Sequence, residues 1–490
     1  MDQATQSGSI AELAEITHTH KHMVSLKTLT WATLGIVAVM GALYYVLGFP
    51  PAFDTYYEIM YFHAIGIGIA ALASYLVIDV FKLERIEPAL DFPIAYRAFW
   101  AVALGALGGL VYLTPSISNA LPDIGLLLFI LAFVLIGDVG GALFVELVLL
   151  PRKLAGIYSE DTRNLFDYVG RLVPVSGADR HSYRAMGASY WLALVSVAAA
   201  FLAGIAGFVN LWLRIAGPSI FSGWMNWVGL DTSGFEDSTL DPHSHLMALA
   251  IMAGIVAAAA VSFGVLKDDS RVRRALARVG LWIAILGVIG TAAVMMAIAF
   301  LNFAPPTLFA NGQDGVNGMA GDDVMMSVIG IGALIVVVAM ALNRRIWSNG
   351  VRLLVLGTWV AAMVLNVVEG FYIELHEDQF QNALSSNDAS FSVGQPMTGI
   401  FLLTVLSLLL LLVDHYGVAG RGRQIIAAVA GLGLLGAFLG TTLWTFADPA
   451  NNGVSFGIYV AGTAFVYVGL VLGALAIRLV RVSRLTLPTT

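Results

Sequence analysis

The sequence has no cysteine among its 490 residues. Disulfides, thiolate metal sites, cysteine-ligated iron–sulfur clusters and covalently attached c-type haem are therefore excluded. Charged residues make up only 12% of the chain, whereas about 25% is usual for a soluble protein. Hydrophobic residues make up 59%. Because one compact core stops growing at about 250–300 residues, this composition excludes a soluble enzyme, a disordered scaffold and a secreted disulfide-rich module.

Long apolar runs take the place of the missing charges. A run of about 20 residues is long enough for a helix to cross the bilayer, and the period-2 alternation of an outer-membrane barrel is absent. The sequence therefore predicts an all-α polytopic membrane helix bundle with about twelve transmembrane helices. The predicted spans cover approximately residues 29–48, 58–81, 96–114, 122–150, 186–214, 243–266, 276–303, 322–343, 351–375, 396–416, 424–446 and 455–479.

Basic residues are nearly absent from one side of this arrangement. With twelve spans, 24 of the 25 lysines and arginines fall in the tails and loops of one side, and Arg214 is the exception. Cytoplasmic segments carry such an excess of basic residues. Both termini are therefore expected in the cytoplasm, and the protein in the plasma membrane of a prokaryote. Membrane lipid is an expected partner and nucleic acid is not.

The segments outside the spans are short. The first 28 residues lack the pattern of a cleaved signal peptide, so the first span is expected to be retained. We expect cytoplasmic tails at 1–28 and 481–490 around a transmembrane domain at 29–480. In the cytoplasmic loop 151–185, the sequence pattern predicts one amphipathic surface helix.

The two longest outer loops, 215–242 and 377–395, are acidic and rich in glycine, serine and asparagine. Such a surface is either simply solvated, a docking face for additional subunits, or a lid over a site.

Four histidines fall near the outer ends of three predicted spans: His63, His243, His245 and His376. Imidazole is a common ligand for haem iron, copper and other transition metals, and ionisable groups at membrane depth are functional by default. The alternative is that each histidine is an interfacial residue that hydrogen-bonds a loop. We predict these four as metal ligands, with His63, His243 and His245 binding a cofactor.

The two histidines of the sixth span raise a geometric question. Asp241 is a candidate N-cap, and Pro242 suits the first helical position. In an α-helix, His243 and His245 lie about 200° apart around the axis, so each would serve a different site. If the helix instead starts after His245, both histidines can reach one metal.

Three buried acids are candidates for proton transfer. Asp138 and Glu146 lie eight residues apart in the fourth span, on roughly the same face. Glu369 lies in the ninth span, on the same helical face as His376. A protonated acid in an interhelical hydrogen bond is the alternative. Arg214, at the outer end of the fifth span, is a candidate partner for haem propionates or a snorkelling residue.

The sequence resembles the catalytic subunits of haem–copper oxidases and nitric oxide reductases, and more loosely the NnrS membrane haem proteins. The resemblance rests on the twelve spans, on His63 in the second span and on the His243-Ser244-His245-Leu246 helix. In that superfamily a span-2 histidine and one histidine of a His-x-His pair hold a low-spin haem. The departures are that the pair lies in span 6 instead of span 10, that no His-His dipeptide supplies a copper site, and that only four outer-side histidines are present.

The resemblance implies one or two b-type haems, with a copper or non-haem iron ion as a further cofactor. It implies an oxidoreductase that takes electrons from a quinol or a cytochrome and passes them toward a small molecule such as NO or O2. A twelve-helix secondary transporter and a non-catalytic membrane anchor of a respiratory complex are the alternatives.

Overall fold

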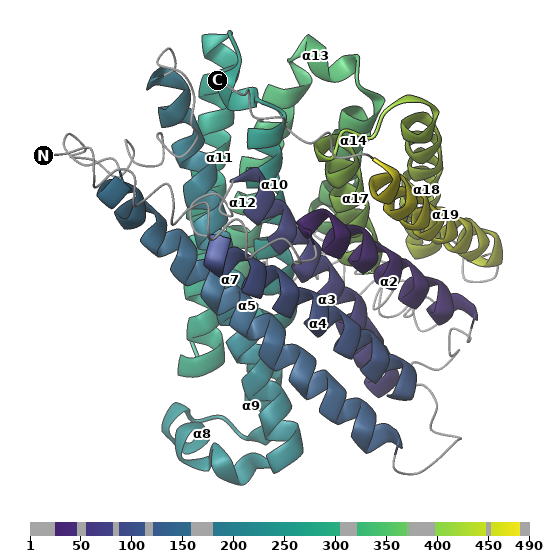
Figure 1. The fold of residues 1–490 in the computed structure, drawn as a ribbon. Coiled ribbons are helices and arrows are strands. Elements are labelled where there is room, and N and C mark those ends of the chain that lie inside the picture. Colours follow the sequence, from purple (N-terminus) through teal and green to yellow (C-terminus); the bar gives the residue numbers. More distant parts are fainter. Residues whose placement is uncertain are drawn as a thin grey trace, which may run out of the picture.

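A computed structural model of the protein describes residues 25–46, 55–81, 88–112, 121–157, 180–303, 321–369, 372, 397–446 and 452–480, and all structural statements concern these residues. They are almost entirely helical, and none of them forms a strand. Twelve of the helices are long and apolar enough to cross a membrane. The predicted all-α bundle of twelve transmembrane helices is therefore confirmed (Figure 1).

The helices that carry the spans follow one another along the chain. They are α2 (Leu26–Val46), α3 (Thr55–Val80), α4 (Pro88–Tyr112), α5 (Leu121–Ile157), α7 (Arg180–Ala216), α9 (Thr232–Asp241) with η4 (Pro242–Leu246) and α10 (Met247–Ser262), α11 (Arg271–Leu301), α12 (Gly321–Ala341), α14 (Gly350–Met363) with η6 (Val364–Glu369), η8 (Met397–Leu402) with α17 (Leu403–His415), α18 (Gly420–Phe446) and α19 (Asn452–Leu479). Short helices connect them at η3 (Pro218–Ile220), α8 (Ser222–Val228), η5 (Val265–Lys267) and α13 (Arg344–Trp347).

The two ends of the bundle differ in charge. One end, here called the basic end, carries η5 and α13 with Lys267, Arg344 and Arg345. The opposite end, here called the α8 end, carries the short helix α8 (Figure 1).

Glycines let neighbouring helices approach until their backbones touch. A Cβ atom added to Gly462 in α19 would lie 2.1 Å from the backbone nitrogen of Ala437 in α18, and one added to Gly332 in α12 would lie 2.4 Å from that of Ala284 in α11. Small residues of this kind are the usual basis of tight helix packing in membranes, where lipid offers apolar side chains as good an environment as protein does.

Three of the spans contain a turn of π-helix, and all three turns lie toward the α8 end. They are η4, η6 and η8. At η4 the cause is visible in the sequence, because Pro242 has no N–H to donate to the α-helical ladder. Turns of π-helix interrupt α-helices most often at functional sites.

The segment predicted as a loop at 215–242 contains the helices α8 and α9, which form a cap at the α8 end of the bundle. The helix begins at Thr232, where the Asp231 side chain accepts a hydrogen bond from the backbone of Gly234 at 2.7 Å. The prediction that Asp241 caps a helix starting at Pro242 was therefore wrong, because the π-turn carries the chain through this proline without a break. Phe235, Met225 and Leu213 form a small apolar core beneath the cap.

Several predictions fall outside the described residues. They include the amphipathic helix of the cytoplasmic loop, nearly all of the N-terminal tail, the loop 377–395 and the C-terminal tail. Within the loop predicted at 151–185, α5 continues to Ile157 and α7 already begins at Arg180.

Candidate functional site

His63 and His243 meet in the interior of the bundle. Their Nε2 atoms lie 3.3 Å apart, with His63 in α3 and His243 in the π-turn η4. The two rings are nearly parallel, with centroids 5.6 Å apart and planes 12° apart. The structure therefore brings together two of the predicted ligands, and it does so through the ring nitrogens that most often bind metals.

The His243 ring is held from its far side. Its Nδ1 atom lies 3.1 Å from the carbonyl oxygen of Ala203 in α7. A carbonyl can only accept, so Nδ1 carries the proton and donates it, which leaves the Nε2 lone pair directed at His63. This is the arrangement in which a second partner fixes the tautomer of a metal-ligating histidine.

Two further contacts shape the space around the pair. A Cβ atom on Gly207 would lie 2.2 Å from Nδ1 of His243, so only glycine leaves room for the imidazole against α7. The ring of Phe133 in α5 meets the His63 ring edge-on, with centroids 5.0 Å apart. Four spans therefore contribute to the position of the two imidazoles.

His245 does not join this pair. Its side chain is exposed, and its Nδ1 lies 3.4 Å from the hydroxyl of Ser244. As expected from residues two positions apart in a helix, the rings of His243 and His245 face different directions. The alternative in which both reach one metal from the start of a helix does not apply, because the chain is helical through both residues.

Two nitrogens are too few for a closed metal site of the structural zinc type, which uses four ligands. The structure has no group of three or more histidine, aspartate or glutamate side chains that could hold a metal within the residues that it describes. Two facing imidazoles could instead supply two nitrogen ligands to a metal whose remaining ligands come from elsewhere.

The two imidazoles are in direct hydrogen-bond contact, so they would have to move apart to hold a metal between them. Metal–nitrogen bonds of about 2.0–2.1 Å place two opposed nitrogens about 4 Å apart, compared with the 3.3 Å between the Nε2 atoms.

Glu369 ends the π-turn η6 and is buried, with 6% of its surface exposed. Its Oε1 atom accepts a hydrogen bond of 2.7 Å from the Thr442 hydroxyl in α18. Its Oε2 atom has no hydrogen-bond partner in the part of the chain that the structure describes. A buried carboxyl with one unpaired oxygen is suited to hold a proton and to exchange it.

The π-turn η8 packs against η6, the π-turn that ends at Glu369. The hydroxyls of Thr398 in η8 and Thr441 in α18 lie 2.6 Å apart. A Cβ atom on Gly399 would lie 2.5 Å from Oδ1 of Asn366 in η6. The two π-turns and α18 thus form a polar region in the α8-end half of the bundle.

The two acids of α5 occupy different environments, which corrects their assignment to one face. Asp138 forms an ion pair with Arg97 of α4 and is 48% exposed, whereas Glu146 is buried. Eight residues turn an α-helix by about 80° beyond two full turns, which is enough to separate the surface from the interior. A single proton path through both acids is therefore not supported.

Two predicted residues cannot be compared with the rest of the site. Arg214 lies near the end of α7, but its side chain lies outside the described part, as does all of His376. Tyr372, which lies between Glu369 and His376 in the sequence, contacts the ring of Phe446 with centroids 6.0 Å apart.

No protein-family model, curated protein or solved structure matches the chain. The arrangement of the site is therefore interpreted from its own chemistry.

Sequence reasoning missed several residues that shape the site: Ala203, Gly207, Phe133, Thr442 and Asn366. Of these, Asn366 and Thr442 are polar side chains within apolar runs, which is a signal that could have been used. Ala203 and Gly207 act through a carbonyl and through the absence of a side chain, and neither gives a signal in a single sequence.

Proposed function

We propose that the protein is an integral-membrane b-type haem redox protein, in which His63 and His243 would hold one haem. The observation that carries the proposal is the approach of their Nε2 atoms to 3.3 Å with nearly parallel rings. An interfacial histidine satisfied by a loop would have no reason to face a second histidine from another span.

The surrounding residues support this role. The Ala203 carbonyl holds the proton on Nδ1 of His243, so that Nε2 is free to donate its lone pair. In the contact between the two rings, Nε2 of His63 is therefore the donor and Nε2 of His243 the acceptor. Bound haem would supply one-electron transfer.

Electron transfer across the membrane is commonly balanced by proton transfer, and Glu369 is the acid best placed for it. Its carboxyl is buried and keeps one oxygen unpaired within the described residues. Glu146 is buried as well. Asp138 forms an ion pair with Arg97, so it is a weaker candidate for proton transfer than the two buried acids.

The resemblance to haem–copper oxidases and nitric oxide reductases suggests a quinol or a cytochrome as electron donor and NO or O2 as acceptor. His245 is exposed instead of facing a second internal centre. One haem held by His63 and His243 is therefore the core of the proposal, while a second haem, a copper or non-haem iron ion and a catalytic reaction are its extensions.

The basic end is proposed to face the cytoplasm, with both termini on that side and the α8 end outside, in the plasma membrane of a prokaryote. The basis is the positive-inside rule. The exposed tryptophans Trp224 and Trp227 of α8 suit an interfacial position or a docking face for additional subunits. Reporter fusions at Arg274 and Asp237 test the orientation, since the first should read cytoplasmic and the second external.

An absorption spectrum of protein produced with haem available tests the haem. The reduced protein should show b-type bands, and His63→Ala and His243→Ala should each abolish them or convert the haem from low-spin to high-spin in EPR. His245→Ala is the matched control, because this residue lies two positions away and is exposed, and it should keep the wild-type spectrum. A colourless folded protein, or equal loss in all three variants, would contradict the proposal.

Secondary transport is the second candidate. Its support is that two irregular turns, η6 and η8, lie where the α14 and α17 spans surround the buried acid Glu369, and irregular helices line the binding sites of many transporters. Here Glu369→Gln should abolish proton-coupled uptake without any spectral change. A non-catalytic membrane anchor predicts neither a spectrum nor uptake.

A further inference from the structure

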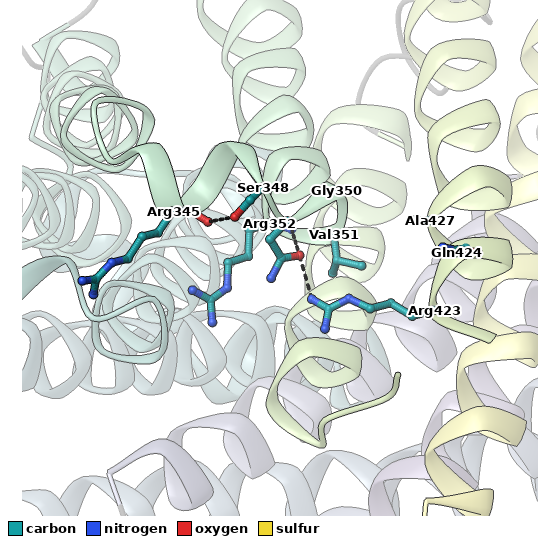
Figure 2. A pocket seen from close by; sticks show the side chains of 9 residues that line it. Arg345, Ser348, Gly350, Val351, Arg352, Arg423, Gln424 and Ala427 are labelled. Carbon is teal, nitrogen blue, oxygen red and sulfur yellow. Dashed lines mark hydrogen bonds between the residues drawn. The ribbon is translucent and has the colours of Figure 1, made fainter. Parts of the chain in front are cut away.

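A cavity of about 540 Å³ opens at the basic end of the bundle, between α13, the start of α14 and the start of α18. Its volume lies within the range of about 300–1,000 Å³ that is usual for small-molecule sites. Figure 2 shows the side chains of Arg345, Arg352 and Arg423 at this cavity, together with Gln424. We call this feature the arginine cavity.

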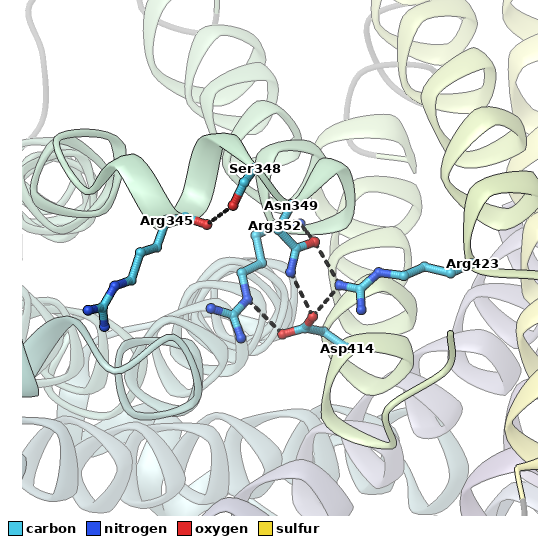
Figure 3. A network of polar contacts seen from close by, with 6 residues as sticks. All are labelled: Arg345, Ser348, Asn349, Arg352, Asp414 and Arg423. Atoms are coloured by element: carbon cyan, nitrogen blue, oxygen red, sulfur yellow. Dashed lines mark hydrogen bonds and ion pairs between the residues drawn. The ribbon is translucent and has the colours of Figure 1, made fainter. Parts of the chain in front are cut away.

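One buried carboxylate organises two of the three arginines. Asp414, at the end of α17, accepts a hydrogen bond from Nε of Arg352 at 2.9 Å and another from Nη2 of Arg423 (Figure 3). Asn349 adds a third hydrogen bond from its Nδ2, at 3.2 Å. The Asp414 side chain is only 8% exposed, so it holds the arginines from below instead of competing for a ligand.

Asn349 holds the same two arginines from the other side. It is the N-cap of α14, and its Oδ1 accepts from the backbone of Arg352 at 3.3 Å and from Nη2 of Arg423 at 2.6 Å. The guanidinium of Arg352 also lies over the ring of Phe263, 4.9 Å from its centroid. The cationic groups are therefore held in place before any ligand arrives, which reduces the entropy that binding must overcome.

The arginine cavity keeps a surplus of positive charge. Three arginines line it, and Asp414 neutralises one of them. Arg345 has Asp268 as an electrostatic neighbour, but that carboxylate is already paired with Arg273 at 2.6 Å. Within the described residues, the terminal nitrogens of Arg352 and Arg345 hydrogen-bond no carboxylate. The positive end of the α14 dipole lies at the same place and adds to the attraction for an anion.

We propose that the arginine cavity binds a phosphate group. Planar guanidinium groups form bidentate hydrogen bonds with phosphate, and a surplus of two positive charges is enough to neutralise a phosphate monoester or a diester. The phosphate can belong to an anionic phospholipid or to a soluble phosphate compound. Ile425, which directly follows Gln424 of the cavity wall, is 53% exposed on the apolar surface of α18, so acyl chains would find an apolar surface beside the cavity.

The test uses the full chain in nanodiscs and two probes. The first probe is phosphatidylglycerol, offered in competition with phosphatidylcholine, and native mass spectrometry measures the lipid that stays bound. The second probe is inorganic phosphate, titrated calorimetrically into protein in phosphatidylcholine nanodiscs. Retention of phosphatidylglycerol identifies the lipid source and binding of inorganic phosphate identifies the soluble source; either supports the proposal.

Arg345→Gln and Arg423→Gln should weaken binding of the probe about tenfold, as expected for the loss of one charge-assisted hydrogen bond. Arg344→Gln and Arg421→Gln are the matched controls, because these arginines lie one position from Arg345 and two positions from Arg423 and do not line the cavity. Arg345 does not touch Asp414, so its replacement leaves the network under the cavity intact and keeps the test valid even if Arg423→Gln unfolds the protein. Absence of binding by both probes, or equal weakening in the controls, would overturn the proposal.

Discussion

The Nε2 atoms of His63 and His243 lie 3.3 Å apart although 180 positions separate the two residues in the sequence. The approach depends on the π-turn η4, which carries His243 within hydrogen-bonding distance of the Ala203 carbonyl in α7. A backbone irregularity, a glycine and a carbonyl oxygen thus combine to position one imidazole. A histidine that binds a metal needs this degree of positioning, whereas an interfacial histidine that only hydrogen-bonds a loop does not.

Gly207→Ala tests whether that positioning matters. The added Cβ would lie 2.2 Å from Nδ1 of His243, so the ring must move and lose its bond to Ala203. We expect haem affinity to fall about 10–100-fold, the usual effect of losing a group that orients a ligand. Titration of the apoprotein with haemin measures it. Gly204→Ala is the matched control, since its Cβ would meet only the Met247 methyl group at 3.7 Å; similar affinities in both variants would contradict the role of Gly207.

The number of spans could be predicted from the sequence because a bilayer imposes one length on every crossing helix. All twelve predicted spans overlap the helices found. The start of the sixth helix was misjudged because Pro242 is typical of a first helical turn, whereas here a π-turn accommodates it inside the helix. Hydropathy carries no information about such backbone irregularities.

The candidate site was predicted in part. His63 and His243 were singled out because both fall at one depth, and depth follows from position within a span. The rotation of each helix about its axis is less well determined, so Asp138 and Glu146 were assigned to one face although one is half exposed and the other buried. The arginine cavity escaped notice because the sequence assigned Arg352 and Arg423 to two separate loops, where basic residues are expected in any case, whereas they lie in the first turns of α14 and α18.

Thr442→Val tests the environment of Glu369. The change removes the hydrogen bond to Oε1 and leaves the buried carboxyl without a partner among the described residues. We expect the protein to lose about 1–3 kcal/mol of stability, the usual cost of an orphaned buried polar group. Thr445→Val is the control, because the Thr445 hydroxyl has no partner in the described part. Thermal unfolding in detergent measures both, and equal losses would argue against a special role for the Glu369–Thr442 bond.

Acid should loosen the turn between α10 and α11. Burial of Asp268 favours its neutral form, but hydrogen bonds from Arg273 and the Ser270 backbone outweigh this effect and hold the pKa of Asp268 below its ordinary value of 3.8. A lowered folded-state pKa stabilises the turn above the unfolded-state pKa, and this stabilisation disappears as the pH falls through the folded-state value. Pepsin cleavage at 264–270 should therefore rise steeply below about pH 3.8. In Asp268→Asn the turn should be cleaved to the same extent throughout this range, and an unchanged steep rise in that variant would assign the effect to another acid.

Gly462→Ala tests the contact that joins α18 and α19. The new methyl group would lie 2.1 Å from the Ala437 backbone nitrogen and 2.7 Å from Cα of Gly436. Because these atoms belong to a helix backbone, no side-chain rotation can relieve the overlap, and the helices must separate. We expect the free energy of unfolding to fall by about 1–3 kcal/mol, the range for overpacking in a protein interior. Gly457→Ala on the same helix is the matched control. No atom lies within 4 Å of its Cβ position, so this variant should gain up to about 1 kcal/mol from the higher helix propensity of alanine. Unfolding in a denaturing detergent separates the two, and a Gly462→Ala protein as stable as Gly457→Ala would show that α18 and α19 do not depend on this close approach.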